Sequence, residues 1–566
     1  MAVEDAVEIC QAGAKQGMRG SFVDRMRSLG ACGQWPSNFE QEFHRLAKKV
    51  FGVNYELYKV KTICKDNLRV TRDVHLSVLL PHEIAHLLYT YNRDRFLQVF
   101  SVHKAHVFWL KTIDRNEVWF QQHPLRDQII AAPDKSIFLP FSIFGDDGTM
   151  RKTRMMHTIT WFSSLYSELP HLESRFPGYM VPGHMMIPDI TEPHMQEAFA
   201  WSFSVWLTGY FPSLDHKLEQ FPEGSVRKRL ADSRARIAGG YIAVYTNTIA
   251  DDKWLHEHYR FEQHWSKIDI CKDCHAQDAP GPCNYIQSIP FPKRAHADYM
   301  SSEAARRSPL TTVPGFHLSS SRPETMHVGP LGALPDHVGA SLVELCDEGA
   351  FGFQEIGDWQ LRLGSQLKVA HIDFCGFAAA FNESHRIRSF TRAKFSMFVK
   401  STSWPYYKGK AHHCLVLCRW LSAKCAEFAE ANPSPYAKLR ASVLWAWVEF
   451  FQLAGHPADP DWYSEEELKR LDVSTGLILH GAKVLTSLNC AASRPRWKFR
   501  PKLHQMWHIN DNAQLSGRPV RSTWSWKEEE GMGKLSRIAC AVHAARVSDR
   551  SLQRWILQFL NSVEDV

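Results

Sequence analysis

Long apolar runs are missing from this chain of 566 residues. No stretch approaches the roughly 18–20 apolar residues that a membrane-spanning helix needs, so we expect no membrane segment. The first five residues include two acidic side chains and no apolar core, and we therefore expect no secretory signal. Low-complexity tracts are absent as well, which excludes a largely disordered protein.

A disulfide framework is the second missing feature. The thirteen cysteines are scattered from Cys10 to Cys540, and their odd number fits no complete set of pairs. Cysteine usage of this kind is typical of reduced thiols, so the sequence predicts an intracellular compartment.

The composition that remains is that of a large folded protein. Hydrophobic residues make up 44% of the chain, which is enough for more than one core, and we expect two or three subdomains. The formal net charge of +7 suits a nucleic-acid partner, although many enzymes have a similar balance.

Residues 137–165 form the stretch around which the functional interpretation is built. An apolar, aromatic-rich run ends in Gly-Asp-Asp-Gly at residues 145–148, and a second apolar run follows a short basic turn. This pattern predicts a β-hairpin whose buried first strand ends in a carboxylate. The glycines allow a turn there and leave room for an ion or substrate. The alternative is a turn that only joins two strands.

A second strand-like run ends in the same way. Residues 239–250 are rich in β-branched and aromatic side chains, and Asp251 and Asp252 follow directly. If the two predicted strands are neighbours, their terminal carboxylates converge, and such a group of oxygen ligands suits a divalent metal.

Two further motifs have metal-ligand spacing. Cys271 and Cys274 form a Cys-x-x-Cys pair, Cys283 follows nine residues later, and His275 or His264 offers a fourth ligand, so the sequence predicts a structural zinc loop. Residues 82–86 read His-Glu-Ile-Ala-His, which on a helix is typical of a zinc protease with Glu83 as general base. Pro81 places this motif at a helix start, and Glu117 is the downstream acidic residue at a tolerable spacing for a third ligand.

The second half of the chain has mainly helical periodicity. Residues 415–429, 436–453 and 465–489 repeat apolar side chains at helical spacing, whereas residues 280–323 predict an extended connection. A basic stripe interleaved with tryptophan then suits a phosphate backbone; its members are Arg496, Lys498, Arg500 and Lys502. A final helix opens in the segment that begins at Trp524 and carries three glutamates, residues 528–530, in its first turns.

Taken in order, these elements resemble DDE transposases of the CACTA (En/Spm-like) kind, including transposase-derived proteins. Residues 140–146 with 161–164 resemble the family's first-Asp hairpin, and residues 250–254 with the Cys-x-x-Cys pair resemble its second-Asp segment. Further similar stretches are residues 309–315, 324–332, 501–508, which resemble a lysine/histidine strand, and 528–534, which resemble the catalytic-Glu helix.

The resemblance implies an α/β fold: an RNase H-like mixed sheet with a large, mainly helical insertion and a small α+β N-terminal region. The corresponding regions are the N-terminal part at 1–130, the first part of the catalytic core at 131–260, a zinc loop and linker at 261–325, the helical insertion at 326–490, and the last part of the core at 491–566.

The implied activity is DNA strand cleavage and strand transfer with two Mg²⁺ or Mn²⁺ ions. The implied metal ligands and catalytic residues are Asp146, Asp252 and Glu529, with Asp147, Asp251, Glu528 and Glu530 as open alternatives. The side chains of Arg151, Lys152 and Lys253 are expected to neutralise phosphate. DNA is the implied partner, the nucleus the implied compartment, and a homo-oligomer is compatible with both.

Three positions depart from the family pattern: Glu324 replaces an expected Asp, Asp251 replaces an expected Gly, and the triple Glu leaves the third ligand open. These departures are compatible with a domesticated or inactive copy. Two alternatives to the enzyme therefore stand beside it: a non-catalytic, transposase-derived DNA-binding protein, and the zinc protease.

Overall fold

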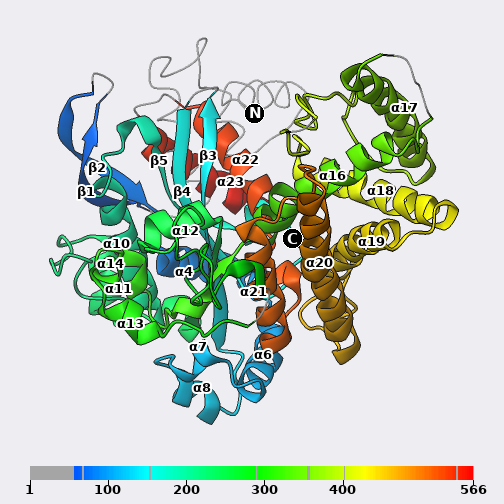
Figure 1. The fold of residues 1–566 in the computed structure, drawn as a ribbon. Coiled ribbons are helices and arrows are strands. Elements are labelled where there is room, and N and C mark those ends of the chain that lie inside the picture. Colours follow the sequence, from blue (N-terminus) through cyan, green and yellow to red (C-terminus); the bar gives the residue numbers. More distant parts are fainter. Residues whose placement is uncertain are drawn as a thin grey trace, which may run out of the picture.

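A seven-stranded mixed sheet forms the centre of the computed structural model, and a lobe of long helices lies beside it (Figure 1). The structure describes residues 56–66, 69–151, 154–287, 290–352, 357–400, 402–542 and 546–564. Helices and strands share one chain in alternation, which confirms the expected mixed α/β class. Among the described helices, none combines the length and apolar character that crossing a membrane requires.

The strand order places the two predicted acidic strands next to each other. The order across the sheet is β1-β2-β5-β4-β3-β6-β7. Strands β3, β4 and β5 are consecutive antiparallel neighbours, whereas β6 runs parallel to β3, and β7 runs parallel to β6. The bounds are β1 Tyr58–Lys65, β2 Thr71–Val78, β3 Phe138–Arg151, β4 Arg154–Ser163, β5 Phe176–Pro182, β6 Ile242–Ala250 and β7 Ser321–Pro323.

The β3–β4 hairpin was predicted correctly, but its turn was predicted too early. Strand β3 continues through the Gly-Asp-Asp-Gly sequence, where Asp146 pairs with Thr158 and Asp147 with His157. Pairing with the parallel neighbour β6 ends at Gly145 opposite Ala250. The hairpin therefore extends beyond β6, and Asp146 lies at the point where the parallel pairing stops rather than in a turn.

Gly145 has a packing role instead. A Cβ atom at this position would lie 2.0 Å from Cε2 of Trp254, so only glycine lets the indole pack flat against the strand.

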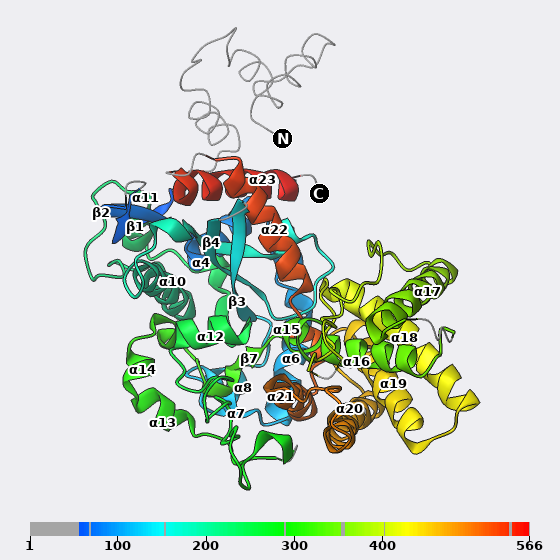
Figure 2. The ribbon, with the colours of Figure 1, turned by 45° about the horizontal axis from the view of Figure 1, so that its top comes forward.

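Neighbouring residues of β3 face opposite sides of the sheet, and different helices cover these sides. Helix α22 (Trp526–Cys540) packs on the side of Asp146, where it crosses the sheet beside α23 (Leu552–Glu564), as Figure 2 shows. Helices α10 (Thr191–Thr208) and α12 (Asp252–Tyr259) cover the side of Asp147. On that side Phe141 stacks on Phe203 of α10, with ring centroids 4.0 Å apart.

The described residues before β3 contribute two strands at one edge of the sheet and five helices. Of the predicted N-terminal α+β region, residues 1–55 lie outside the described residues. The remainder contains β1, β2 and helices α4 (Pro81–Tyr91), α5 (Arg93–Val99), α6 (Val102–Asp114), α7 (Val118–Gln121) and α8 (Arg126–Ala131).

The predicted extended connection is only partly extended. It contains the short helices α13 (His296–Ser301) and α14 (Glu303–Arg306), and it ends in β7, which adds an edge strand to the sheet. A three-residue strand is too short to show any periodicity, so sequence patterns did not predict it.

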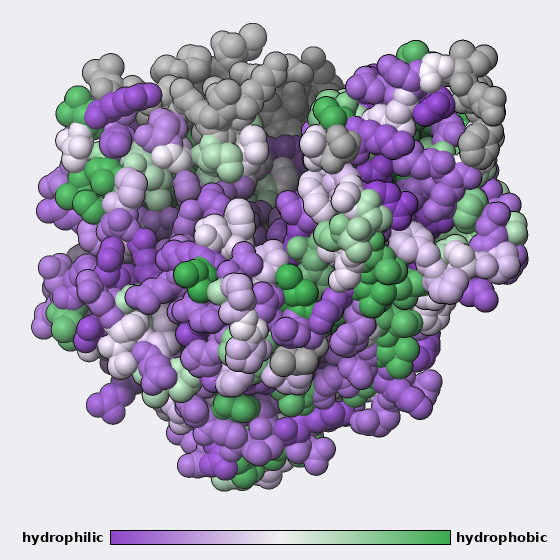
Figure 3. Space-filling model, in the orientation of Figure 1, coloured by the Kyte–Doolittle hydropathy of each residue, from purple (hydrophilic) through white to green (hydrophobic). Residues whose placement is uncertain are grey.

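The helical lobe has its own hydrophobic core, separate from that of the sheet. The predicted helices of this region are confirmed as α18 (Ala411–Ala431), α19 (Pro435–Gly455) and α20 (Glu465–Ala491). Helices α16 (Leu334–Asp347) and α17 (Trp359–Ala380) complete the lobe, and the short α15 (Thr325–Val328) joins it to β7. On the face seen in Figure 3, apolar side chains gather along α20, where Val473, Val484 and Leu488 are exposed.

Residues 501–508, which resemble a family strand, are helical instead. They open helix α21 (Pro501–Ser516), so the expected strand is wrong. Pro501 stands in the first helical turn, where its missing N–H costs nothing. Leu503, Met506 and Ile509 recur at helical spacing and are buried in the core of the lobe.

We predict that Gly145→Ala destabilises the fold by about 1–3 kcal/mol, because the added methyl group would overlap the indole of Trp254. Gly364→Ala in α17 is the matched control: no atom lies within 4 Å of its Cβ position, and removing a helical glycine is expected to be neutral or stabilising. Urea unfolding of both variants measures the difference. Equal stability of the two would contradict the packing role of Gly145.

Candidate functional site

Two carboxyl groups from distant parts of the chain meet on one side of the sheet. Asp146 of β3 and Glu529 of α22 are close enough for their carboxyl groups to hydrogen-bond, although 382 positions separate them in sequence numbering (529 − 146 − 1). Burial raises the pKa of Asp146 to about 8, and the negative charges of Glu529 and Asp251 contribute to the rise. The pKa of Glu529 is also raised, chiefly by burial. The pair therefore holds a proton at neutral pH unless a cation replaces it.

Asp251, rather than Asp252, is the carboxylate of the second strand that acts on this pair. The charge of Asp251 affects both Asp146 and Glu529, which follows from the register, since Gly145 and Ala250 are partners and each is followed by one of these aspartates. Asp251 also caps α12 by accepting a hydrogen bond from the Trp254 N–H at 2.6 Å. Asp252 turns away into the first turn of α12 and accepts a hydrogen bond from Gln505 at 2.9 Å.

The three consecutive glutamates of helix α22 point in different directions and therefore have different surroundings, which the sequence alone could not distinguish. Glu528 is buried and paired with Arg175, whose Nε donates to its Oε1 at 2.7 Å. Glu530 is exposed and pairs with Lys534 one turn later. Only Glu529 faces Asp146, because successive residues of a helix point about 100° apart.

His327 lies beside the acidic group, although the sequence pattern did not single it out. Its Nδ1 lies 2.7 Å from Oε2 of Glu324, a fully buried carboxylate that also accepts hydrogen bonds from the N–H groups of Met326, His327 and Ser525. Burial lowers the pKa of His327, but the hydrogen bond to Glu324 and the charges of Asp251 and Glu529 outweigh this, so the net shift is upward. The imidazole beside the carboxylates is therefore more readily protonated than an ordinary histidine.

Lys502 brings a second cation to the same place. It extends from the first turn of α21, and its Nζ donates to the carbonyl oxygen of His327 at 2.7 Å. Burial lowers the pKa of this lysine more than the nearby charges of Asp251 and Asp252 raise it, so the net shift is downward. His327 and Lys502 thus form a basic border along one edge of the acidic group, and Glu324 orients His327.

The three acidic side chains have the ligand chemistry of a divalent-cation site, but among the described residues they do not form a group whose ligand atoms all lie within 4.8 Å of one another. Asp146, Asp251 and Glu529 offer only carboxylate oxygens, the ligands that Mg²⁺ and Mn²⁺ prefer. Because the fold holds these acidic groups close together, we expect them to be partly protonated when no cation is bound. These three residues would hold the ion.

We predict that Asp146→Asn stabilises the metal-free protein at high pH. The pKa of Asp146 in the folded state lies above its ordinary value of 3.8, so its stabilising contribution is complete below about pH 4 and is lost as the pH rises toward 8. The variant should therefore melt a few degrees above the wild type at pH 8 in EDTA, since about 1 kcal/mol corresponds to about 2–4 °C, and the gap should narrow toward pH 4.

The exposed Glu530→Gln is the control for this measurement and should leave the melting temperature unchanged at both pH values. Added Mg²⁺ or Mn²⁺ should stabilise the wild type and not Asp146→Asn. A variant that is no more stable than the wild type at pH 8 would show that the carboxyl group is not under this strain.

A second, sulfur-containing cluster lies on the other side of α21. It consists of four buried residues, Cys271, Cys274, His504 and His508, whose ligand atoms all lie within 4.8 Å of one another. Cys271 Sγ is 3.2 Å from His508 Nε2, Cys274 Sγ is 3.2 Å from His504 Nε2, and the two Nε2 atoms are 3.1 Å apart. Histidines four positions apart share one face of a helix, which brings both rings to the Cys-x-x-Cys turn.

These four atoms fit a tetrahedral metal such as zinc. With Zn–S near 2.3 Å and Zn–N near 2.0–2.1 Å, tetrahedral ligand atoms are about 3.3–3.6 Å apart, close to the separations here. Burial raises the pKa of the Cys271 thiol, so a bound cation is what would favour its thiolate. Of the predicted zinc ligands, the structure brings Cys271 and Cys274 together. His275 is exposed and Cys283 half-buried, and His504 and His508 take their positions in the group.

The two clusters are connected through α21. This helix carries His504 and His508 at the Cys-x-x-Cys turn, Lys502 beside the acidic group, and Gln505, which donates to Asp252. A metal in the Cys/His cluster would therefore fix the segment after β6 against α21 and hold both contacts in place.

We predict that the purified protein contains about one zinc ion per chain and that Cys271→Ser or His508→Ala removes it. Because the cluster lies in a hydrophobic core, loss of the metal should also lower the melting temperature by several degrees. Elemental analysis and thermal denaturation measure the two effects. Cys283→Ser is the control and should retain the metal; unchanged zinc in Cys271→Ser would contradict the assignment.

The basic residues predicted to contact DNA have mixed surroundings. Arg496 is buried and paired with Asp347 at 3.0 Å, and Arg500 is paired with Asp336, so both are structural. Lys253 and Lys498 are exposed, and Lys502 borders the acidic group. The side chain of Arg151 and the whole of Lys152 lie outside the described residues.

The His-Glu-Ile-Ala-His motif occupies the first turns of α4, as Pro81 suggested. His82 is buried and lies 2.7 Å from Ser202 Oγ, and Nδ1 of His86 accepts a hydrogen bond from the Ala238 N–H at 3.2 Å. Glu83 is paired with Arg227 at 2.6 Å. These contacts engage all three side chains in packing, and they are not among the residues that form a metal-binding group in the described part of the chain.

The sequence matches no known family and no curated protein.

Proposed function

We propose that the protein is a transposase-like enzyme that cleaves and transfers DNA strands with divalent metal ions. The observation that carries the proposal is the contact between Asp146 and Glu529, with Asp251 near enough for its charge to act on both and with His327 and Lys502 beside them. Acidic groups arranged in this way are how proteins bind the metal ions of phosphodiester chemistry.

The sheet supports the proposal through its topology. We infer an RNase H-like fold from three antiparallel strands, β3 to β5, extended by the parallel strands β6 and β7. The first carboxylate lies on the first of these strands, the second follows the fourth, and the third comes from a helix after a long helical insertion. This order matches the resemblance to CACTA-type transposases.

Each residue of the site has a part in the proposed reaction. Divalent ions held by the three carboxylates would supply activation of a water or 3′-hydroxyl nucleophile and stabilisation of the leaving oxygen. Glu324 orients His327 through Nδ1 and keeps its charge, so that the ring can face a phosphate oxygen. Lys502 supplies a second charge for the same phosphate, and the exposed Lys253, two residues after Asp251 at the start of α12, supplies one for the strand beyond it.

We predict that Asp146→Asn, Asp251→Asn or Glu529→Gln lowers metal-dependent nicking of supercoiled plasmid DNA at least about 100-fold, because each removes a ligand that acts on the developing charge. The matched controls are Glu528→Gln and Glu530→Gln, which flank Glu529 on the same helix but face away from the site. Asp252→Asn should reduce nicking less than Asp251→Asn, since Asp252 acts through Gln505.

Nicking that survives the loss of Asp146 would contradict the assignment. Salt-dependent DNA binding without any metal-dependent product would instead favour the non-catalytic DNA-binding alternative. The protease alternative has the least support, since Glu83, its general base, is held in an ion pair with Arg227.

A further inference from the structure

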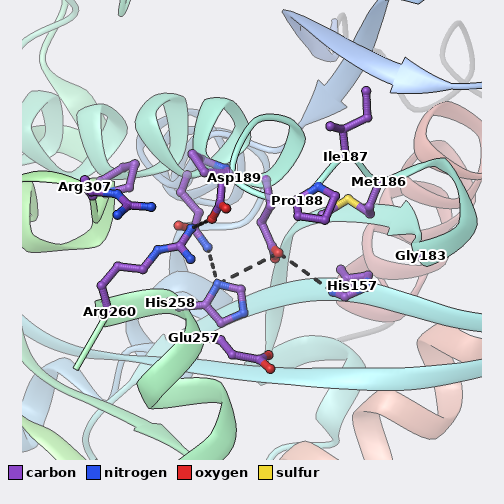
Figure 4. A pocket seen from close by; sticks show the side chains of 14 residues that line it. His157, Gly183, Met186, Ile187, Pro188, Asp189, Glu257, His258, Arg260 and Arg307 are labelled. Atoms are coloured by element: carbon purple, nitrogen blue, oxygen red, sulfur yellow. Dashed lines mark hydrogen bonds and ion pairs between the residues drawn. The ribbon is translucent and has the colours of Figure 1, made fainter. Parts of the chain in front are cut away.

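A pocket of about 350 Å³ lies on the side of the sheet opposite Glu529 (Figure 4). It is bordered by β4, the segment after β5, the first turns of α10, the end of α12 and the loop after α14. Its volume is in the range of sites that hold a small organic ligand. The reaction proposed above uses none of the residues that line it.

The floor of the pocket contains a carboxylate oxygen that lacks a close partner. Glu192 is buried, and its Oε1 accepts a hydrogen bond from the Tyr179 hydroxyl at 2.8 Å. Its Oε2 lies 3.8 Å from His157 Nδ1 and 3.9 Å from His258 Nδ1, which is too far for a hydrogen bond. Among the described residues nothing else satisfies Oε2, so this atom is left to accept a hydrogen bond from a ligand.

The two imidazoles beside it are already engaged, which argues against a metal ion here. His157 Nδ1 lies 2.9 Å from Asp147 Oδ1, and His258 Nδ1 lies 2.8 Å from Gln196 Nε2. Binding a cation through these nitrogens would break both contacts. A neutral N–H or NH₂ group of a ligand meets the open oxygen of Glu192 without disturbing them.

The walls and rim of the pocket suit a ligand that consists of a flat ring joined to a phosphate. Apolar side chains line one side, and Figure 4 shows Met186, Ile187 and Pro188 there. Arg260 and Arg307 lie on the other side. Arg260 is paired with Asp189 at 2.5 Å, whereas the exposed Arg307 has no ion pair within the part of the chain that the structure describes.

Helix α12 connects the pocket with one member of the acidic group. Helix α12 is capped by Asp251 and carries His258 seven residues later, which corresponds to about 10 Å along the helix axis. Successive nucleotides of one B-form strand are about 3.4 Å apart along the duplex, so the rise from Asp251 to His258 along α12 corresponds to about three nucleotides.

We propose that this pocket binds one unstacked nucleotide of the DNA substrate, close to the cleaved phosphate. Its base enters between the apolar wall and the arginines and donates an amino or imino hydrogen to Glu192, while Arg307 contacts its phosphate. The inference rests on the proposed function, since it takes the ligand to be part of the cleaved DNA.

Binding of the mononucleotide dGMP to the full chain, measured by saturation-transfer NMR, tests the pocket independently of DNA cleavage. We expect saturable binding that Arg307→Glu weakens about 10-fold and that Met186→Trp, which fills the pocket, abolishes. Arg306→Glu is the matched control, because this neighbouring exposed arginine does not line the pocket, and it should bind dGMP as the wild type does.

Three results would overturn the pocket assignment: no saturable binding to the wild type, equal binding by wild type, Arg307→Glu and Met186→Trp, or competition by deoxyribose 5-phosphate as effective as that of dGMP, which indicates a plain anion site. Glu529→Gln should bind dGMP normally. DNA nicking without dGMP binding therefore rejects only the pocket, whereas dGMP binding without nicking rejects only the nuclease.

Discussion

The repulsion between buried carboxylates is the constraint on which the rest of this structure depends. The fold brings Asp146 and Glu529 together in a partly dehydrated place and adds the charge of Asp251, so the pair cannot be fully ionised at neutral pH without a cation. Folding alone gains nothing from such an arrangement. The strain is understandable if the group is completed by divalent ions, which favour the ionised form of every member.

Much of the surrounding structure holds this acidic group in place. Glu324, buried and saturated with hydrogen bonds, fixes His327 at its border. Helix α21 contributes Lys502, and the Cys/His cluster on the same helix ties it to the segment that follows the second acidic strand. A metal held by sulfur and imidazole would then position, from a distance, the groups around ions held by oxygen.

Because side chains alternate along β3, neighbouring carboxylates lie on opposite sides of the sheet and have different surroundings. Asp146 faces α22 and the acidic group, whereas its neighbour Asp147 faces α10 and pairs with His157. Two carboxylates that are adjacent in sequence thus act in separate environments. In the first, burial raises the pKa values, and like charges add to the rise; in the second, the pairing with His157 and the charges of His157, His258 and Lys253 together outweigh burial and lower the pKa of Asp147.

Local patterns predicted the elements of this protein well. The apolar runs before the acidic pairs became β3 and β6, and the helical periodicities became α18, α19 and α20, because burial of one face or of a whole strand leaves its spacing in the sequence. The same patterns narrowed the acidic ligands to Asp146 or Asp147, Asp251 or Asp252, and one of three glutamates. A short strand such as β7 and the helical state of residues 501–508 were missed, the latter because a family likeness overrode the spacing of Leu503 and Met506.

Only the tertiary structure decided which of these residues meet. The register between β3 and β6 selects Asp251, and the rotation of α22 selects Glu529, although neither choice is visible in neighbouring residues. His504 and His508 join Cys271 and Cys274 across 229 intervening positions (504 − 274 − 1), a pairing that no spacing rule covers. Sequence determines what each segment can bury and which groups it can offer. Distances between groups far apart along the chain arise only when those buried faces pack against one another.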